Sequence, residues 1–277
     1  MKPLLKWAGG KRAIAGELFS NFPADWDTGT YIEPFIGGGA MFLHINPKKA
    51  VIADLNKRLI NFYTYVKNEP EPIYAKIMDI AKRFNRNSTE ILKKEYFLEI
   101  RKAFNSSEST SLESAAYLYA LNKLCFNGLY RENSRGEFNV PFGQKKIFPA
   151  LELAEVKNVS LLLRNTKIMN SDFETTTKIA KAGDFIYFDP PYIPVNTSSS
   201  FTSYHAVGFD IEDQKRLAEL MVDLAKNGIR AMCSNSDTPV SRDIYKELDI
   251  RAIRAPRMVS AKASGRGSIS ELLVTNY

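Results

Sequence analysis

Residues 183–192 read Gly-Asp-Phe-Ile-Tyr-Phe-Asp-Pro-Pro-Tyr, an apolar and aromatic run that ends in a carboxylate, two prolines and a tyrosine. Such a run is typical of a strand buried on both faces, as in a parallel sheet. Because proline lacks an N–H group and fixes its own φ, the chain must leave the sheet after Asp189. We therefore expect Asp189 and Tyr192 at the carboxyl end of a central strand, where open α/β sheets bind their ligands.

The groups in this turn fit an amine attached to a planar ring. The carboxylate of Asp189 and the carbonyl of Pro190 only accept hydrogen bonds, so together they can take both hydrogens of one amino group. Tyr192 supplies a flat ring on which a base can stack. The turn therefore predicts a clamp for the exocyclic amine of a nucleobase. The alternative is an ordinary strand-to-loop turn.

Two upstream strands end in groups that suit a small ligand. The strand predicted over residues 31–35 runs into Ile36-Gly37-Gly38-Gly39-Ala40, where glycines let the backbone pass close to a small molecule. The strand over residues 50–54 ends in Asp54, and an acid at this place holds ribose hydroxyls in nucleotide-binding folds. A cap on the following helix is the alternative role for Asp54.

Residues 57–164 interrupt the alternation of strands and helices and carry most of the positive charge. They contain 18 basic and 12 acidic residues, whereas residues 165–277 contain 14 of each and the chain has a net charge of +7. We predict helices over residues 73–84, 92–104, 112–124 and 151–163. Segregated basic charge favours an insert that binds a polyanion, with a solvated helical face as the alternative.

Within this insert, residues 127–143 predict a protruding hairpin. They are rich in turn-forming, aromatic and basic residues, and Arg135-Gly136 suits the hairpin tip. Such a ribbon can enter a major groove, where an arginine reads the two acceptors of guanine. Hairpins with surface arginines are also common elsewhere, so these residues alone leave DNA reading open.

The α/β pattern resumes after residue 165. We predict strands over residues 166–173, 229–233, 250–254 and 271–277, and a helix over residues 211–226 that Asp210 caps and Gly228 ends. Residues 193–208 directly follow the Asp189 turn, so we expect a lid there rather than a simple surface loop. Residues 261–267 predict a basic loop in which Lys262 or Arg266 contacts phosphate.

Composition limits the class of protein further. The 277 residues suffice for one large domain with an insert. There is no membrane-spanning apolar run or signal peptide, so a cytoplasmic protein without membrane partners is expected. Cys125 and Cys233 match no metal spacing and are expected to be reduced and buried. Only two histidines are present, which argues against a histidine metal site.

The chain is similar to a known family from residue 6 to residue 277, and four motifs carry the resemblance. They are Lys-Trp-Ala-Gly-Gly-Lys at residues 6–11, Pro-Phe-Ile-Gly-Gly-Gly at 34–39, the Asn-Gly-Leu-Tyr-Arg … Phe-Asn-Val-Pro-Phe-Gly region at 127–143 and Asp-Pro-Pro-Tyr at 189–192. In this order they resemble the Dam-type, α-class DNA adenine methyltransferases, most closely the GATC-modifying methylases of restriction–modification systems.

The resemblance implies a fold and a reaction. The fold is an α/β, Rossmann-like methyltransferase sheet in residues 1–56 and 165–277, with a mostly helical DNA-recognition insert bearing a β-hairpin in residues 57–164. The activity is site-specific methyl transfer from S-adenosylmethionine to the 6-amino group of adenine in duplex DNA, within GATC and by base flipping. A monomer without a metal is implied, together with a cognate restriction endonuclease that acts on the same site without direct contact.

The resemblance also implies roles for individual residues. Asp189 and the Pro190 carbonyl hold the adenine amine, and Tyr192 stacks on the flipped base. Cofactor binding falls to Trp7, Lys11, Phe35, Gly37, Gly39, Asp54, Asp172, Phe173 and Asp189. DNA contacts fall to Lys6, Asn127, Leu129, Arg131, Asn139 and Lys145, with Arg131 at the guanine-reading position.

The chain departs from the family pattern at one place in the recognition region. The family commonly continues Gly-Arg-Tyr-Lys, whereas this chain has Gly-Gln-Lys-Lys at residues 143–146. Lys145 therefore stands where the family has a tyrosine that helps to read an inner base. How strictly this chain discriminates between bases at the inner base pair is left open. An RNA adenine methylase is a further alternative, because basic charge and base stacking serve both polymers. A catalytically inactive DNA-binding module is less well supported, because both Asp189 and Tyr192 are present.

Overall fold

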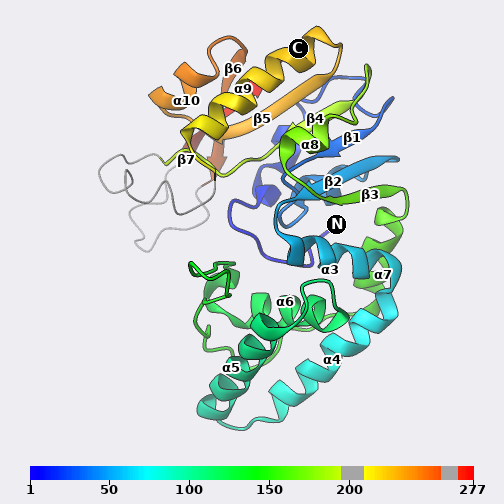
Figure 1. Ribbon diagram of the computed structural model, residues 1–277, viewed down its shortest axis with the longest axis vertical. Coiled ribbons are helices and arrows are strands. Elements are labelled where there is room, and N and C mark those ends of the chain that lie inside the picture. Colours follow the sequence, from blue (N-terminus) through cyan, green and yellow to red (C-terminus); the bar gives the residue numbers. More distant parts are fainter. Residues whose placement is uncertain (195–208, 257–267) are drawn as a thin grey trace. The chain divides into compact units, whose positions relative to one another are not determined.

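The computed structural model describes residues 1–194, 209–256 and 268–277 (Figure 1). Most of the predicted lid and the whole predicted phosphate loop lie outside the described residues. The chain divides into two compact units. We call them the helical unit (Met1–Gly10, Gly37–Asn46 and Asp54–Asn170) and the sheet unit (Lys11–Ile36, Pro47–Ala53 and Ser171–Tyr277). These units are defined by compactness, so the functional boundaries at residues 56 and 165 stay a prediction.

The strands form a seven-stranded sheet in the order β3-β2-β1-β4-β5-β7-β6. Their bounds are β1 Tyr31–Glu33, β2 Ala50–Asp54, β3 Thr166–Asn170, β4 Phe185–Phe188, β5 Arg230–Ser236, β6 Asp249–Pro256 and β7 Ser268–Thr275. β1 pairs in parallel with β2 and β4, β4 pairs in parallel with β5, and β7 lies antiparallel between β5 and β6. This mixed sheet confirms the predicted α/β, Rossmann-like fold.

β4 is the buried central strand that the apolar run predicted. Tyr31 of β1 pairs with Phe185 on one side, and Cys233 of β5 pairs with Phe188 on the other. All of β4 is buried, as expected for a strand with neighbours on both edges and cover on both faces. The strand ends at Phe188, so Asp189 is the first residue beyond it.

The sheet unit contains the helices η1 (Lys11–Ala13), α1 (Ala15–Phe19), α8 (Phe173–Thr177), α9 (Ile211–Lys226) and α10 (Pro239–Ile244). α9 has its predicted bounds because Asp210 and Asp213 form a capping box at its start. Gly228, whose φ of +68° suits glycine, follows its end. Figure 1 shows α9 lying along β5.

α6 (Leu112–Leu124) is the central helix of the helical unit. The other helices are α2 (Ala40–Ile45), α3 (Lys57–Asn68), α4 (Pro70–Arg86), α5 (Glu90–Ser106), η2 (Phe126–Gly128) and α7 (Leu153–Leu163). α6 packs against α3, α4 and α5, and its buried Ala115, Ala116 and Ala120 allow close approach. The four helices predicted in the insert are confirmed as α4 to α7. Cys125, at the end of α6, is buried and free like Cys233, as predicted.

α3 was not predicted, although its sequence carries helix signals. Asn56 accepts a hydrogen bond from the backbone N–H of Leu59 and caps the helix. Leu59, Tyr63 and Val66 share one buried face at helical spacing. These signals would have found the helix had the region between residues 56 and 70 been tested for a helical period.

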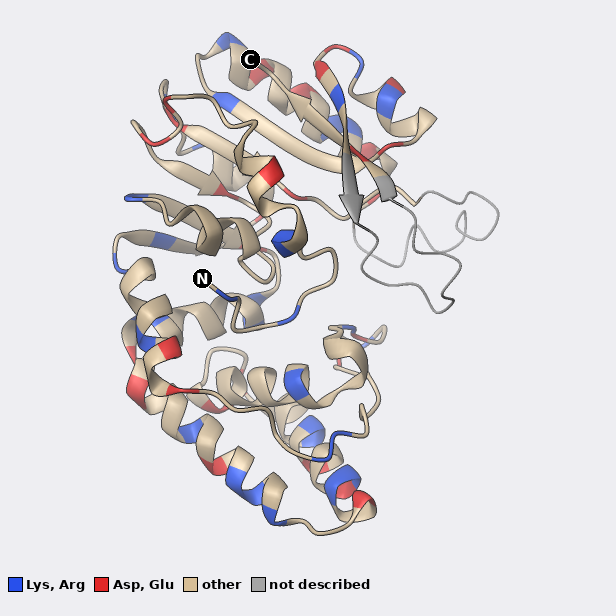
Figure 2. Cartoon of the chain, turned by 180° about the vertical axis from the view of Figure 1, so that it is seen from behind, with Lys and Arg blue, Asp and Glu red and all other residues tan. Residues whose placement is uncertain are grey.

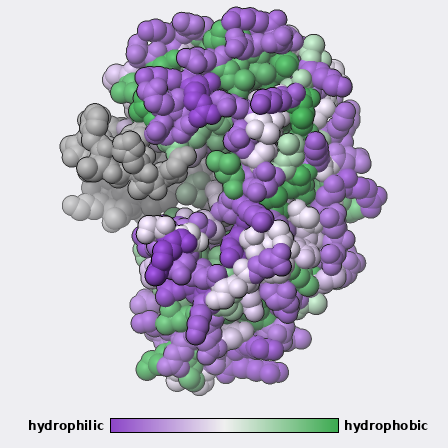
Figure 3. All heavy atoms as spheres, in the orientation of Figure 1, coloured by the Kyte–Doolittle hydropathy of each residue, from purple (hydrophilic) through white to green (hydrophobic). Residues whose placement is uncertain are grey.

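α4 and α5 are amphipathic. Figure 2 shows Lys and Arg interspersed with Asp and Glu along both helices, while Ile73, Ile77 and Phe84 of α4 and Phe97 and Phe104 of α5 are buried. Figure 3 shows hydrophilic residues over most of the visible face, with hydrophobic residues scattered among them. Among the helices of the described chain, none has the length and apolar character needed to cross a membrane.

Candidate active site

A buried polar network fixes the Asp-Pro-Pro-Tyr turn in the sheet unit. The side-chain amide of Gln214 on α9 donates to the Pro191 carbonyl oxygen at 2.8 Å. The backbone N–H of Ile193 donates to the Asn235 side-chain oxygen at 3.1 Å. Asn235 and the Tyr245 hydroxyl both donate to the Gln214 side-chain oxygen, at 2.9 and 2.8 Å. A buried network whose members are paired in this way holds the turn in one conformation.

Asp189 receives two donors on the same carboxylate oxygen. The Lys11 ammonium lies 2.7 Å from Asp189 Oδ1, and the Ser234 hydroxyl donates to Oδ1 at 3.2 Å. Ser234 Oγ is also 2.9 Å from the Tyr187 hydroxyl, which ties the carboxylate to β4 and β5. Within the described part of the chain no donor reaches Asp189 Oδ2. The described residues therefore leave this oxygen able to accept a further hydrogen bond.

Burial governs the protonation of Asp189. Removal from water raises the pKa of its carboxyl group above the ordinary aspartate value, against the opposing effects of the Lys11 charge and of the hydrogen bonds from Lys11 and Ser234. The Lys11 side chain is only 4% exposed and that of Asp189 is 20% exposed. The carboxylate thus places a negative charge 2.7 Å from a nearly buried ammonium.

Tyr192 is held by two neighbours in the sheet unit. The Lys11 ammonium lies 4.2 Å from the centre of its ring, a cation–π distance. Its hydroxyl donates to Glu271 Oε2 at 2.9 Å. Lys11 was assigned to the cofactor from the resemblance, and here it contacts the two predicted catalytic side chains. Its cofactor role stays a prediction.

In the helical unit, the glycine turn brings three predicted cofactor residues together. Gly37 has a φ of +45°, and a Cβ atom there would lie 2.7 Å from Trp7 Cδ1. The Gly37 N–H donates to Asp54 Oδ2 at 3.1 Å, and the Tyr63 hydroxyl donates to the Gly37 carbonyl oxygen at 2.9 Å. Only glycine fits between this backbone and the indole, so the turn, Trp7 and Asp54 form one cradle.

The alternative role of Asp54 as a helix cap is wrong, because Asn56 caps α3. Asp54 instead accepts the backbone N–H groups of Gly37 and Asn56. Burial raises the pKa of Asp54, and these two N–H groups oppose the rise. Its ribose-binding role remains a prediction.

Phe35 and Phe173, also assigned to the cofactor, meet in the sheet unit. Their rings stack with centroids 5.7 Å apart, and Phe209 contacts both edge-on.

Asp172, another residue assigned to the cofactor, has a different environment from these two rings. Its carboxylate accepts the backbone N–H of Thr175 and caps α8, which lowers the pKa of Asp172. An Asp172 contact with the cofactor would use an oxygen already engaged in this cap.

The predicted recognition hairpin is a short loop whose strands are reduced to isolated antiparallel bridges. Glu132 pairs with Phe138, and the chain turns between them at Gly136, whose φ is +74°. Asn139 orients Arg131: the Arg131 Nε–H donates to the Asn139 side-chain oxygen at 2.7 Å. The Arg131 side chain is exposed and that of Asn139 is half-buried. A terminal N–H of Arg131 also donates to the Asn139 carbonyl oxygen at 3.5 Å, so Asn139 orients the guanidinium through two contacts.

The base of this loop is joined to the amino-terminal motif within the helical unit. The Asn122 side chain receives the Lys6 N–H at 2.8 Å and donates to the carbonyls of Lys6 and Gly128. Trp7 stacks on Tyr130 with ring centroids 5.3 Å apart. Of the other residues assigned to DNA, Lys6, Asn127 and Leu129 are exposed and Lys145 is half-buried.

Several residues that shape the site were missed from sequence. Ser234 and Asn235 follow the apolar part of β5 just as Asp189 follows β4, and polar residues at that position of a parallel strand could have pointed to them. Glu271 lies on an antiparallel strand, so its side of the sheet depends on a strand direction that the sequence does not specify. Gln214 lies on the buried, otherwise apolar face of α9, and a single polar residue there gave no signal of a site.

The chain is similar to known proteins over nearly its whole length. Residues 7–259 match the family described as D12 class N6 adenine-specific DNA methyltransferase. It is 40% identical to the Type II methyltransferase M1.LlaDCHI of Lactococcus lactis subsp. cremoris, over 100% of this chain and 96% of the relative. It is 39% identical to the Type II methyltransferase M.MjaIII of Methanocaldococcus jannaschii, over 100% and 99%. It is 38% identical to a DNA adenine methylase of Vibrio cholerae, over 98% and 95%.

These matches agree with the geometry of the two units. Asp189 stands at the end of the central strand, with one oxygen that accepts no hydrogen bond from the described residues, and a glycine turn after β1 contacts the half-buried Asp54. Acceptors and close backbone approaches of this kind suit a nucleotide-like cofactor and an exocyclic amine. The chain belongs to the D12 class of N6 adenine-specific DNA methyltransferases, and S-adenosylmethionine is its cofactor.

Proposed function

We propose that this methyltransferase modifies the adenine of GATC in duplex DNA after drawing that adenine out of the helix. The observation that carries the proposal is the state of Asp189. Lys11 and Ser234 occupy one of its oxygens, and among the described residues none donates to the other, which belongs to the same turn as the Pro190 carbonyl and the Tyr192 ring. An amine that is paired inside a duplex cannot reach such a turn, so the base must leave the stack.

Asp189 and Pro190 hold and orient the target amine in this mechanism. Asp189 Oδ2 and the Pro190 carbonyl each accept one of its hydrogens, which turns the nitrogen lone pair away from the base plane. Tyr192 stacks on the base and fixes the ring. As the nitrogen gains the methyl group it also gains positive charge, which the adjacent carboxylate stabilises until the amine releases one proton to solvent.

S-adenosylmethionine, when bound, supplies an electrophilic methyl group on a sulfonium, and residues within each unit suit parts of this molecule. We assign its ribose to Asp54 and its close backbone approach to Gly37 and Gly39, because a side chain at Gly37 would collide with Trp7. Phe35 and Phe173 supply apolar ring surface. We also assign Lys11, Asp172 and Asp189 to cofactor binding.

Sequence reading is assigned to residues 57–164 and above all to the loop of residues 127–143. Two properties support a reader of guanine there: Arg131 is exposed, and Asn139 orients its guanidinium. Lys6, Asn127, Leu129 and Lys145 are assigned further DNA contacts. The names of two relatives, both Type II methyltransferases, support a cognate restriction endonuclease that acts on the same site. We further propose that the enzyme is a monomer.

Mapping the modified base tests this proposal. The protein is incubated with radiolabelled S-adenosylmethionine and duplexes that differ only in their central four bases, and with the matching RNA duplex. We expect label in the adenine of GATC and at least about tenfold less in singly substituted duplexes. Label in the RNA alone would support the RNA methylase instead, and equal label in all DNA duplexes would exclude GATC.

Asp54→Ala is expected to weaken S-adenosylmethionine binding roughly tenfold and DNA binding by less than about twofold, because one charged acceptor is lost from the cradle. Calorimetry with the cofactor and fluorescence anisotropy with a labelled duplex measure the two affinities. Asp79→Ala, which removes an exposed aspartate paired with Arg83 on α4, is the matched control. Trp7→Ala should also weaken cofactor binding. Its effect is harder to interpret, since Trp7 also stacks on Tyr130. Unchanged cofactor affinity in Asp54→Ala would show that Asp54 is misassigned.

A further inference from the structure

Glu271 reaches the active edge of the sheet because β7 runs opposite to its neighbours. In the register of β5 and β7, Glu271 pairs with Ser236, the last residue of β5. β4 and β5 are parallel, so the carboxyl end of β5 lies at the edge where β4 delivers Asp189. The early part of the antiparallel β7 returns to that same edge. Glu271 therefore enters the site from a strand that is distant in sequence from the Asp189 turn.

The carboxylate of Glu271 contacts the ring that is assigned to base stacking. The Tyr192 hydroxyl donates to Glu271 Oε2 at 2.9 Å, while the Lys11 ammonium lies over the ring face at 4.2 Å from its centre. One contact holds the distal end of the ring and the other holds a face. Because these restraints act on different parts of the side chain, they limit both swinging and tilting of the ring.

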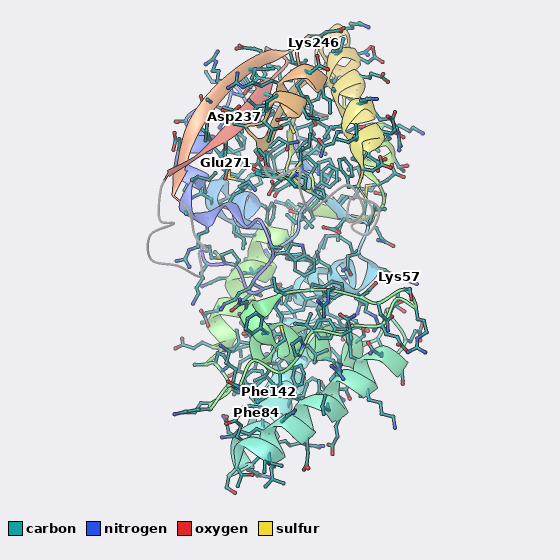
Figure 4. All side chains as sticks on the ribbon, turned by 90° about the vertical axis from the view of Figure 1, so that its left-hand side faces the viewer. Lys57, Phe84, Phe142, Asp237, Lys246 and Glu271 are labelled. Atoms are coloured by element: carbon teal, nitrogen blue, oxygen red, sulfur yellow. The ribbon has the colours of Figure 1, made fainter. Side chains whose placement is uncertain are left out.

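β7 is itself anchored beside Glu271. The Ser270 hydroxyl donates to Asp237 Oδ2 at 2.7 Å, and the Arg242 guanidinium pairs with the Asp237 carboxylate at 2.6 Å. Figure 4 labels Asp237 and Glu271, which lie close together where β5 ends beside β7. The acceptor that holds Tyr192 thus stands on a fixed piece of backbone and not on a free loop.

We propose that Glu271 is a positioning residue for methyl transfer, which acts through Tyr192 by holding its ring in the orientation that stacks on the target base. This inference rests on the proposed role of Tyr192 in stacking. Glu271 itself touches neither base nor cofactor in this role. Its contribution is preorganisation: without the hydrogen bond, binding of the base must also order the ring, and fewer bound bases have their amine aligned with Asp189.

Glu271→Ala should lower kcat roughly tenfold, as expected when one hydrogen bond to a charged acceptor is lost, while KM for DNA and affinity for S-adenosylmethionine change less than about twofold. Glu271→Gln retains an oxygen that accepts the Tyr192 hydroxyl and should restore most of the rate. Glu212→Ala, which removes an exposed glutamate paired with Lys215 on α9, is the matched control and should behave as wild type.

A double-mutant cycle that combines Glu271→Ala with Tyr192→Phe separates positioning of the Tyr192 ring from general destabilisation of the protein. Tyr192→Phe keeps the ring and removes the donor, so Glu271→Ala should have almost no further effect on kcat in that background. A duplex with 2-aminopurine at the target position, bound with S-adenosylhomocysteine, reports stacking directly. We expect brighter fluorescence in Glu271→Ala than in wild type, because the unstacked fluorophore is less quenched.

The outcomes distinguish this inference from the proposed function. All rates are measured on the duplex that the wild type methylates fastest, whatever its sequence. If the wild type methylates no adenine in DNA, the proposed function fails. The positioning role alone is overturned if the wild type is active but Glu271→Ala has the same kcat and the same 2-aminopurine fluorescence. It is also overturned if Glu271→Ala lowers kcat as much in the Tyr192→Phe background as it does in the wild type.

Discussion

Asp189→Ala is expected to reduce methyl transfer by about a thousandfold or more, which is comparable to removing a principal electrostatic group from an active site. The variant loses the acceptor that orients the amine and the charge that stabilises the reacting nitrogen. DNA binding should persist, because the recognition residues lie in other elements. Single-turnover methylation, with DNA affinity measured in parallel, tests both parts.

The stability of this variant must be measured with its activity. Asp189→Ala removes the carboxylate that lies 2.7 Å from the nearly buried Lys11 ammonium. Breaking a buried ion pair by removing one partner costs about 3–5 kcal/mol, and the partial exposure of Asp189 favours the lower end of that range. Asp189→Asn retains an oxygen for Lys11 and should unfold at a temperature closer to wild type, yet it should remain severely impaired because it lacks the negative charge.

Asp223→Ala is the control for Asp189. Asp223 is an exposed aspartate on α9 that pairs with Lys226, so its loss should alter neither rate nor folding. If folded Asp189→Ala retained activity within about tenfold of wild type, the carboxylate would have no principal role in the transfer and the clamp would have to be withdrawn.

Arg131→Ala is expected to relax one base position of the target and leave the others selective. A bidentate arginine–guanine pair discriminates by about 1–3 kcal/mol, so the rate difference between guanine and its substitutes at that position should shrink by roughly tenfold or more. The measurement is the methylation rate on GATC and on each singly substituted duplex. Lys145 in place of the family tyrosine adds an expectation for the wild type, which should show some methylation at sites altered in one inner base.

Arg135→Ala is the control in the same loop. Arg135 is 77% exposed at the hairpin tip and pairs with Glu137, so its loss should slow all duplexes alike and reduce the salt dependence of binding. Asn139→Ala should partly reproduce Arg131→Ala, since it releases the guanidinium. A uniform loss on every duplex in Arg131→Ala would identify Arg131 as a backbone anchor, with guanine read elsewhere.

Local sequence patterns predicted most elements of the fold. The apolar run before Asp189, the glycines after β1 and the acid that ends β2 each mark a strand end, because these signals act within a few residues. The caps of α9 and the helices of the insert were predictable for the same reason. Several strand bounds were wrong by about three residues. The strand predicted over residues 166–173 ends at Asn170, since Asp172 caps α8, and the strand predicted over residues 229–233 continues to Ser236.

The sequence by itself thus determined the α/β class, the helical insert and the identity of the Asp189 turn. Only the tertiary structure decided what surrounds that turn. Lys11 lies 178 positions before Asp189 and Glu271 lies 79 positions after Tyr192, and no local period encodes either contact. They arise from the order of strands and from the reversed direction of β7. Packing of the whole sheet selects both, because burial energy is summed over all strands and is not carried by any single segment.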